Sequence, residues 1–198
     1  PLHRWEHLWR DIYNYNLSVK HRESALKILM GWYHTPDKLH RMYPLTVSDK
    51  CWRGCGHLGM PLHIWNECSK LHSFWEGVLQ TISRITGVTV PDCPAVVVLG
   101  MCPPDWKGPQ LRHWKLIYQL LLVARMTIAR MWKQTVIPHK HTWLWHVWDT
   151  IAMETLIATA DKTRSKLSTT WDPFITYMGE EYAAVTCPPR LRALHLFS

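Results

Sequence analysis

Three cysteines and one histidine, residue types that bind metals, lie close together in the first half of the chain. They are Cys51, Cys55, His63 and Cys68, in the spacing Cys-x3-Cys-x7-His-x4-Cys. Zinc prefers thiolate and imidazole ligands, and four protein ligands make a closed, structural site. The spacing therefore predicts one zinc ion bound by these four residues. The simpler alternative is a set of free thiols beside a surface histidine.

Other residues in the same segment allow competing interpretations. His57 is a rival ligand, but it follows the second cysteine too closely for usual ligand spacing, so His63 is preferred. Gly54, Gly56 and Gly59 match the G-x-G-x-x-G dinucleotide fingerprint. We reject that match, because it follows no predicted strand and opens no predicted helix. Gly54 and Gly56 instead permit the tight backbone path between two ligands.

The positive charge of the chain is concentrated in one segment. The formal net charge is +8, yet residues 106–148 contain no Asp or Glu and seven basic residues, which leaves 16 basic against 15 acidic residues elsewhere. A local positive field attracts phosphate or an anionic membrane surface. No run of 18 apolar residues is present, so no membrane span is predicted. These features favour RNA or DNA as the partner, with no membrane and an intracellular location in cytoplasm and nucleus.

The elements that must position these residues are predicted to be helices. Helical spacing and capping signals predict helices within 1–20 and 24–35, over 69–87, 110–133 and 142–162, and from 171 onward. Ser24, Ser69 and Asp172 are the expected caps, with Pro173 in a first turn. Residues 95–99 fit a short buried strand or a packed extended segment. The predicted fold is mainly α, with an inserted Cys3His segment that resembles a zinc knuckle.

This organisation divides the chain into four parts. They are an N-terminal helical segment at 1–50, the zinc segment at 51–68, a helical C-terminal region at 69–182 and a basic tail at 183–198. Within the long helix of the third part, Arg112, Lys115, Arg130 and Lys133 fall on one side. Arg125 lies near the apolar stripe, where it either has a buried partner or points into a groove.

Three residues of the zinc segment are further candidates for nucleic-acid contact. Trp52 and Trp65 lie inside the zinc loop rather than on a helical stripe, which favours base stacking, and Arg53 is their basic neighbour. No nucleophile–base pair has a recognisable setting, so a Cys–His hydrolase is disfavoured and no catalytic residue is predicted. A structural docking domain that uses zinc only to fold is the main alternative.

Several stretches resemble the C-terminal region of the polyprotein of LINE-type non-LTR retrotransposons. The similar stretches are residues 29–36, 39–44, 51–55, 62–68 and 74–75, followed by 121–133 and 171–174. That family has a zinc-binding segment downstream of its reverse transcriptase, with the same cysteine–cysteine–histidine–cysteine order. The resemblance covers most of residues 25–178, and the zinc segment is its most specific part.

The resemblance implies a role in binding element RNA or target DNA during target-primed reverse transcription. It also implies the upstream reverse transcriptase domain as a partner. Polymerases need paired aspartates for two metal ions, and this sequence has no Asp-Asp dipeptide. We therefore expect a non-catalytic C-terminal piece. The docking alternative remains, in which the domain packs on the polymerase and does not contact nucleic acid.

Overall fold

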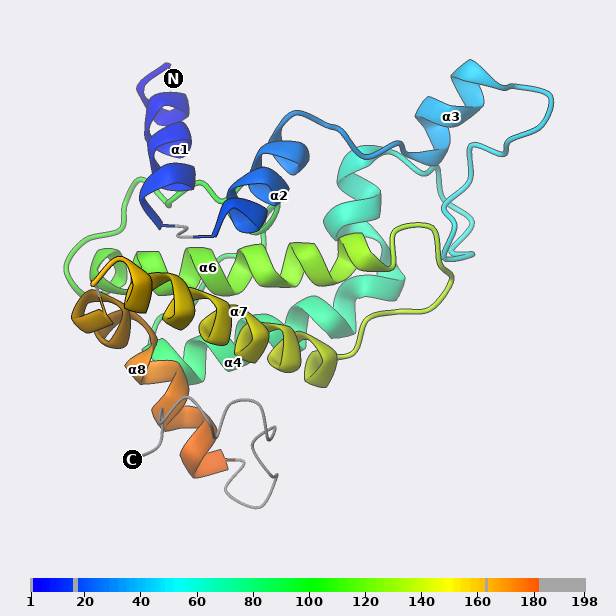
Figure 1. Ribbon diagram of the computed structural model, residues 1–198. Helices are drawn as coiled ribbons and strands as arrows, with labels where there is room; N and C mark the ends of the chain where they lie inside the picture. Colours follow the sequence, from blue (N-terminus) through cyan, green and yellow to red (C-terminus); the bar gives the residue numbers. More distant parts are fainter. Residues whose placement is uncertain (1, 16–17, 163, 182–198) are drawn as a thin grey trace.

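The longest helix, α6 (Pro109–Arg130), runs through the middle of the computed structural model (Figure 1). The structure describes residues 2–15, 18–162 and 164–181. The helices that pack against α6 are α1 (Leu2–Tyr15), α2 (Val19–Leu29), α4 (His72–Thr86), α7 (Lys140–Ala160) and α8 (Arg164–Glu181). Over these residues there is no strand, only an isolated bridge between Lys50 and Leu58. The predicted mainly helical fold is confirmed.

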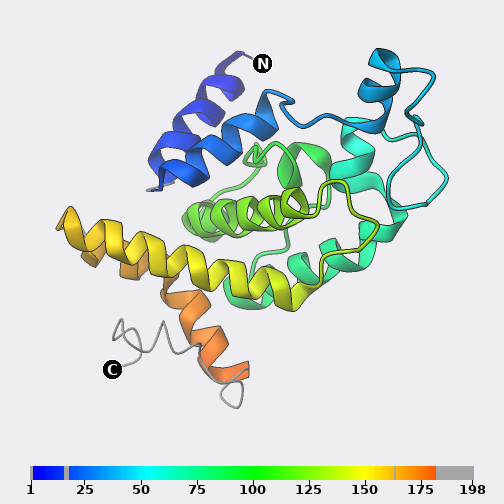
Figure 2. The same ribbon diagram turned by 45° about the vertical axis from the view of Figure 1, so that its right-hand side comes forward.

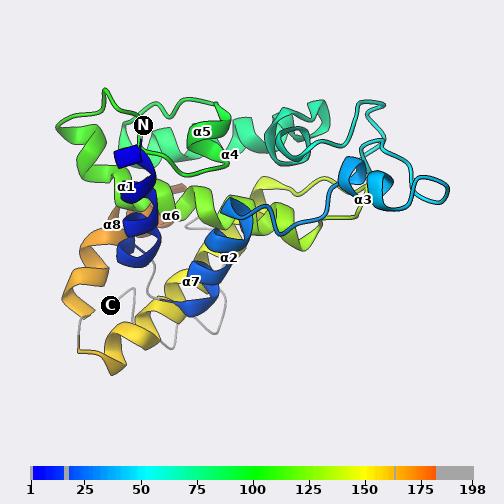
Figure 3. The ribbon, with the colours of Figure 1, turned by 90° about the horizontal axis from the view of Figure 1, so that it is seen from above.

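Four short helical segments connect the long helices. They are α3 (Pro36–Met42), a π-helix (His63–Glu67), a 3-10 turn (Ser69–Leu71) and α5 (Pro94–Val97). Seen from above, α4 and α5 lie on one side of α6, with α2 and α7 on the other (Figure 3). Figure 2 shows α1 and α2 together above α6. The loop that carries the candidate ligands extends beyond the C-terminal end of α6, beside α3 (Figure 3).

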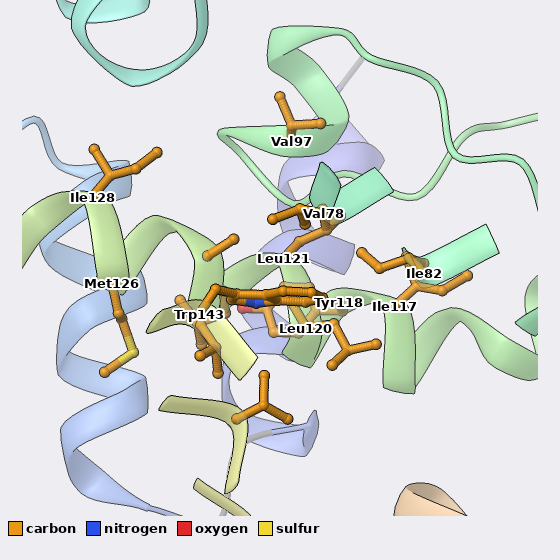
Figure 4. Packing of buried hydrophobic residues seen from close by; sticks show 14 of the residues in the cluster. Val78, Ile82, Val97, Ile117, Tyr118, Leu120, Leu121, Met126, Ile128 and Trp143 are labelled. Carbon is orange, nitrogen blue, oxygen red and sulfur yellow. The ribbon is translucent and has the colours of Figure 1, made fainter. Parts of the chain in front are cut away.

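The middle of α6 is buried on every side. Each residue from 116 to 128 is buried, including Gln119, Arg125 and Thr127. Figure 4 shows Leu121 facing Val78 of α4, with the Trp143 ring of α7 beside Leu120. The four basic residues predicted to share one side of this helix therefore lie on either side of a fully buried middle. A helix that packs against five others needs apolar residues around its whole circumference.

The predicted starts of two helices are also wrong, whereas one predicted end is confirmed. Ser18 precedes α2, and Ser24 lies inside that helix with its hydroxyl donating to the Lys20 carbonyl at 2.8 Å. Ser69 lies in the 3-10 turn before α4. Gly87 ends α4 at φ +67°, a backbone conformation that glycine adopts without steric cost.

Residues 95–99 do not form a strand or an extended segment. Pro94 is the first residue of α5, and Val96 and Val97 are buried. Proline fixes φ near the helical value and lacks only an N–H that a first turn leaves unpaired. That local preference lets a very short apolar run close into a single helical turn.

Helix α8 begins well before the predicted cap at Asp172. Pro173 lies inside the helix instead of in its first turn. Trp171 and Phe174 on either side are 1% and 0% exposed, and the Trp171 Nε1–H donates to the Glu154 carboxylate at 3.0 Å. Burial of two large rings stabilises this packing by several kcal/mol, about as much as an internal proline destabilises a helix. The predicted tail at 183–198 lies outside the described residues.

Candidate metal centre

The first two candidate ligands lie in a tight loop. The Gly54 N–H donates to the Cys51 carbonyl at 3.0 Å and closes a turn. Gly54 and Gly56 have φ of +67° and +82°, values that side chains rarely allow. The two glycines reverse the chain twice within five residues. This path brings the thiols of Cys51 and Cys55 to the same side of the loop.

A short antiparallel contact fixes the base of this loop. Lys50 and Leu58 form an isolated bridge, and the Cys51 N–H donates to the His57 carbonyl at 2.9 Å. The loop is therefore held closed by backbone hydrogen bonds on both sides of its turn. This arrangement fixes the backbone between the first two candidate ligands.

The second ligand pair is positioned by the π-helix His63–Glu67. The Cys68 N–H donates to the His63 carbonyl at 2.9 Å, across five residues. In an α-helix, residues five apart point about 140° away from each other. The wider π turn brings His63 and Cys68 to one side. Single π turns are rare and occur frequently at functional sites.

The four side chains converge on one point. Their ligand atoms all lie within 4.8 Å of one another. The Sγ atoms of Cys51 and Cys68 are 3.9 Å apart, and Cys55 Sγ lies 3.1 Å from His63 Nε2. Two thiolates at about 2.3 Å from one tetrahedral zinc are about 3.8 Å apart. The four residues predicted from the spacing are thus brought together and could hold one metal ion.

Burial and charge act differently on the four groups. Burial raises the pKa of the Cys51 thiol to about 12, against the opposing hydrogen bond from the Arg53 backbone N–H. Burial also lowers the pKa of His63, and the nearby His57 and Arg53 lower it further. His63 is therefore a neutral imidazole at neutral pH, which is the form that binds metals.

The Cys55 thiol ionises more easily. Partial burial acts to raise its pKa, but hydrogen bonds from the His57 backbone N–H and from the Cys51 and Cys68 thiols outweigh burial and lower the pKa. The thiolate is the form of cysteine that binds a metal cation.

His57, the rival ligand, stays outside the cluster. Its ring lies 5.7 Å from the His63 ring, measured between centroids, and it is not among the four converging side chains. Its backbone contributes instead, because its carbonyl accepts from Cys51 and its N–H donates to Cys55. The preference for His63 agrees with this geometry.

Arg53 links the two ligand pairs. It is 6% exposed, and its Nη1 donates to the Ile64 carbonyl at 2.9 Å, within the π-helix. The guanidinium thus connects the Cys51–Cys55 loop to the turn that carries His63. A buried side chain cannot contact a nucleic-acid strand, so the expectation of such a contact for Arg53 is not supported.

An aromatic cluster joins the metal loop, residues 51–55 with the π turn that follows it, to the end of α6. Trp132 lies 4.6 Å from Trp65, 5.0 Å from Tyr33 and 5.9 Å from Trp52, measured between ring centroids. Its Nε1–H donates to the His34 carbonyl at 2.7 Å. Trp65 is 5% exposed, so it offers no face to a base. Trp52 is half-buried and uses one side of its ring against Trp132.

The predicted basic side of α6 is divided into two ends. Arg112 is exposed and Lys115 is partly exposed near its start, whereas Arg130 and Lys133 are exposed at and beyond its end. Eighteen residues of helix separate Arg112 from Arg130, which is about 27 Å. Helices cover the stretch between them. Only the second pair adjoins the metal loop, through Trp132.

Arg125 has a buried partner rather than a groove. It is 2% exposed, donates through Nη1 to the Val98 carbonyl at 2.7 Å, and lies over the Tyr118 ring at 5.7 Å. Burial lowers the pKa of Arg125 to about 10, so the guanidinium remains charged at neutral pH. The expected contact between Arg125 and nucleic acid is therefore not supported. The Arg125 side chain instead tethers the end of α5 to α6.

The contact between Trp132 and the candidate metal segment is not predictable from the sequence. The contacts of Trp132 with Trp52 and Trp65 span about 70 to 80 positions along the chain, and no local pattern predicts such a pairing.

No protein-family model matches the sequence. Among the described helices, none is both long and apolar enough to cross a membrane.

Proposed function

We propose that the chain is a zinc-containing nucleic-acid-binding module, related to the C-terminal segment of LINE-type retrotransposon polyproteins. The convergence of Cys51, Cys55, His63 and Cys68 is the observation that carries this proposal. Three thiolates and one imidazole at tetrahedral spacing favour zinc over the oxygen-binding cations. Four protein ligands leave no open position for a substrate, so the metal has a structural role.

The proposed metal would join two neighbouring segments of the chain, and aromatic packing would connect them to α6. It holds the Cys51–Cys55 loop to the π turn, and the aromatic cluster around Trp132 holds both to α6. Zinc therefore stabilises the surface on which Arg130 and Lys133 lie. We propose that these two residues contact nucleic-acid phosphate, which the acid-free composition of residues 106–148 supports.

The related polyproteins suggest the setting of this module. We propose that it binds RNA or target DNA beside an upstream reverse transcriptase domain and supplies no catalytic step itself. The closed donor set and the missing Asp-Asp dipeptide support a non-catalytic role. An intracellular location in cytoplasm and nucleus belongs to the same proposal.

Metal content and RNA binding, measured on one preparation, test the proposal. Elemental analysis should find one zinc per folded chain, and fluorescence anisotropy should show RNA binding that weakens as salt rises. Folded protein without metal would contradict the zinc assignment. Metal-loaded protein that binds neither RNA nor DNA at low salt would contradict the nucleic-acid assignment.

A second candidate is a docking domain that binds the polymerase and not nucleic acid. The observation that favours it is an aromatic stripe on α1, where Trp5, Trp9 and Tyr13 are 43%, 39% and 55% exposed. Residues four apart lie on one face of a helix, so the three rings form one apolar surface. Zinc binding without nucleic-acid binding would favour this candidate.

A further inference from the structure

A polar seam connects α2, α6 and α7 on the side away from α4. The Nε2 atom of His21 lies 3.2 Å from the Thr150 hydroxyl, and the Nδ1 atom of His146 lies 2.8 Å from the Thr127 hydroxyl. These two contacts bring α2 and the C-terminal half of α6 onto α7. Figure 3 shows α2 running over α7 where both meet α6.

The hydroxyl groups determine which histidine nitrogens carry protons. Thr150 donates its hydroxyl hydrogen to the His146 carbonyl at 2.8 Å, and Thr127 donates to the Val123 carbonyl at 2.8 Å. Each hydroxyl therefore accepts from its histidine. The network assigns Nε2–H to His21 and Nδ1–H to His146. Because burial lowers the pKa of each ring to about 4, both are neutral at neutral pH and one lone pair remains on each.

Two cations lie at the surface of this seam. Lys20 precedes His21, and Arg130 is three residues after Thr127 on the same face of α6. Burial lowers the pKa of His21 to about 4, and the positive charges of Lys20 and Arg130 lower it further. The contacts from His21 to Thr150, and from His146 to Thr127, bring the parts of α2 and α6 that carry these two charges to the same seam.

The same two cations act on the second histidine. The pKa of His146 is also lowered to about 4, by burial first and then by Arg130, with Lys20 contributing less. Asp149 raises this pKa and is the only carboxylate that acts on either ring in the part of the chain that the structure describes. The two imidazoles thus lie in a net positive field.

Neither cation is neutralised by an ion pair. The described side chains form salt bridges between Lys27 and Glu23 and between Arg41 and Asp37, and none of these involves Lys20 or Arg130. The buried Nδ1 of His21 also has no hydrogen-bond partner among the described residues. Two exposed, uncompensated cations next to neutral imidazoles can accept an anion at little desolvation cost.

We infer that Lys20 and Arg130 form a phosphate-binding site for the nucleic-acid backbone where α2, α6 and α7 meet. This inference rests on the proposed nucleic-acid function and assigns it to one end of the molecule. Arg130 is two residues before Trp132, so the site adjoins the metal loop. Arg112 and Lys115 lie at the opposite end of α6 and are not part of it.

Paired substitutions on the zinc-loaded chain test the site. Lys20→Ala combined with Arg130→Ala should weaken binding to single-stranded RNA at least about tenfold at low salt. The slope of log affinity against log salt should become shallower by about 1.4, since each phosphate contact on a single strand contributes about 0.7. Arg112→Ala combined with Lys115→Ala removes the same charge and should change affinity less than about twofold.

The outcomes separate this site from the proposed function. Loss of affinity that is equal for the two pairs, with both variants folded by circular dichroism, would show a diffuse charge effect and overturn the site. Full RNA affinity in the Lys20/Arg130 variant would also overturn it. Wild-type protein that binds no nucleic acid would instead overturn the proposed function.

Histidine NMR signals provide a second measurement that does not depend on affinity. An RNA phosphate beside Lys20 and Arg130 would offset their charges, so the pKa values of His21 and His146 should rise when RNA is bound. Exposed His72 is the control and should not respond. Unchanged titration of both seam histidines would overturn the inference. An equal response to inorganic phosphate would reassign the site to free phosphate and overturn the nucleic-acid assignment.

Discussion

The backbone N–H of Cys68 donates to the carbonyl of His63 at 2.9 Å, five residues earlier. This π-type hydrogen bond brings two proposed ligands to one side of a turn that would otherwise separate them. The first ligand pair is positioned by glycine turns, and the second pair depends on this local widening of a helix.

Loss of a ligand should release the metal. Cys68→Ser and His63→Ala should each weaken zinc binding, measured by competition with a chelator, because a four-ligand site would lose one donor. Structural zinc contributes about 10 kcal/mol to the folding of small modules, so a loss of several kcal/mol is expected on urea unfolding. His57→Ala is the matched control and should retain one zinc. Metal loss in the His57 variant alone would reassign the ligand.

Arg53 should support the metal loop rather than bind nucleic acid. Arg53→Met keeps much of the side-chain volume but removes the hydrogen bond to the Ile64 carbonyl, which would remain buried. We expect a loss of about 1–3 kcal/mol in the free energy of unfolding and faster zinc release. Arg112→Met, at an exposed position, should change neither quantity. A stable Arg53 variant with normal zinc release but weakened RNA binding would contradict this prediction.

Trp52 should couple the metal loop to α6. Its ring lies 5.9 Å from that of Trp132, so Trp52→Ala should loosen the loop and accelerate zinc release. The expected loss of stability is about 1–3 kcal/mol, less than for a fully buried tryptophan. Trp32→Ala is the control, because that ring is 67% exposed. Reduced RNA affinity with unchanged zinc release would instead identify Trp52 as a base-stacking residue.

The seam histidines should make the fold sensitive to acid. The pKa of His21 is about 4 in the folded chain and about 6.5 in the unfolded chain, so the unfolded state binds the proton more readily between these values. The stability that neutral His21 contributes is therefore fully present above pH 6.5. This contribution decreases as the pH falls and is lost by pH 4. The contribution of His21 is about 3 kcal/mol.

Urea unfolding at several pH values checks this contribution. His21→Gln should flatten the loss of stability between pH 6.5 and 4, because glutamine does not titrate. The exposed His72→Gln should leave the pH dependence unchanged. A wild-type chain whose stability is constant over this interval would contradict the buried, neutral state of His21.

Two glycines with positive φ should respond differently to alanine. Gly87 has φ +67° and open space around it, so Gly87→Ala should cost about 1 kcal/mol from backbone strain alone. Gly100 has φ +73°, and a Cβ there would lie 2.9 Å from Tyr118 Cε2 and 3.0 Å from Arg125 Nη1. Gly100→Ala should therefore destabilise the chain more strongly, measured by thermal unfolding. Equal losses would mean that the Arg125 and Tyr118 side chains move aside freely.

Local patterns in the sequence by themselves determined several features. The apolar spacing of residues 71–85 with Gly87 defined a helix and its end, because both depend on neighbours within one or two turns. The choice of Cys51, Cys55, His63 and Cys68 needed only residue type and spacing, since these ligands lie within 18 positions.

Only the tertiary structure decided the roles that depend on distant contacts. Local sequence suggests that Trp65 and Arg53 contact nucleic acid, and it leaves Arg125 open between a buried partner and a groove. Packing against other segments buries all three. The polar seam joins His21 to Thr150, which are 129 positions apart. Pro173 remains inside α8 because Trp171 and Phe174 pack against other elements. Burial depends on the sum of contacts around a residue, and a linear pattern contains only the contacts along its own element.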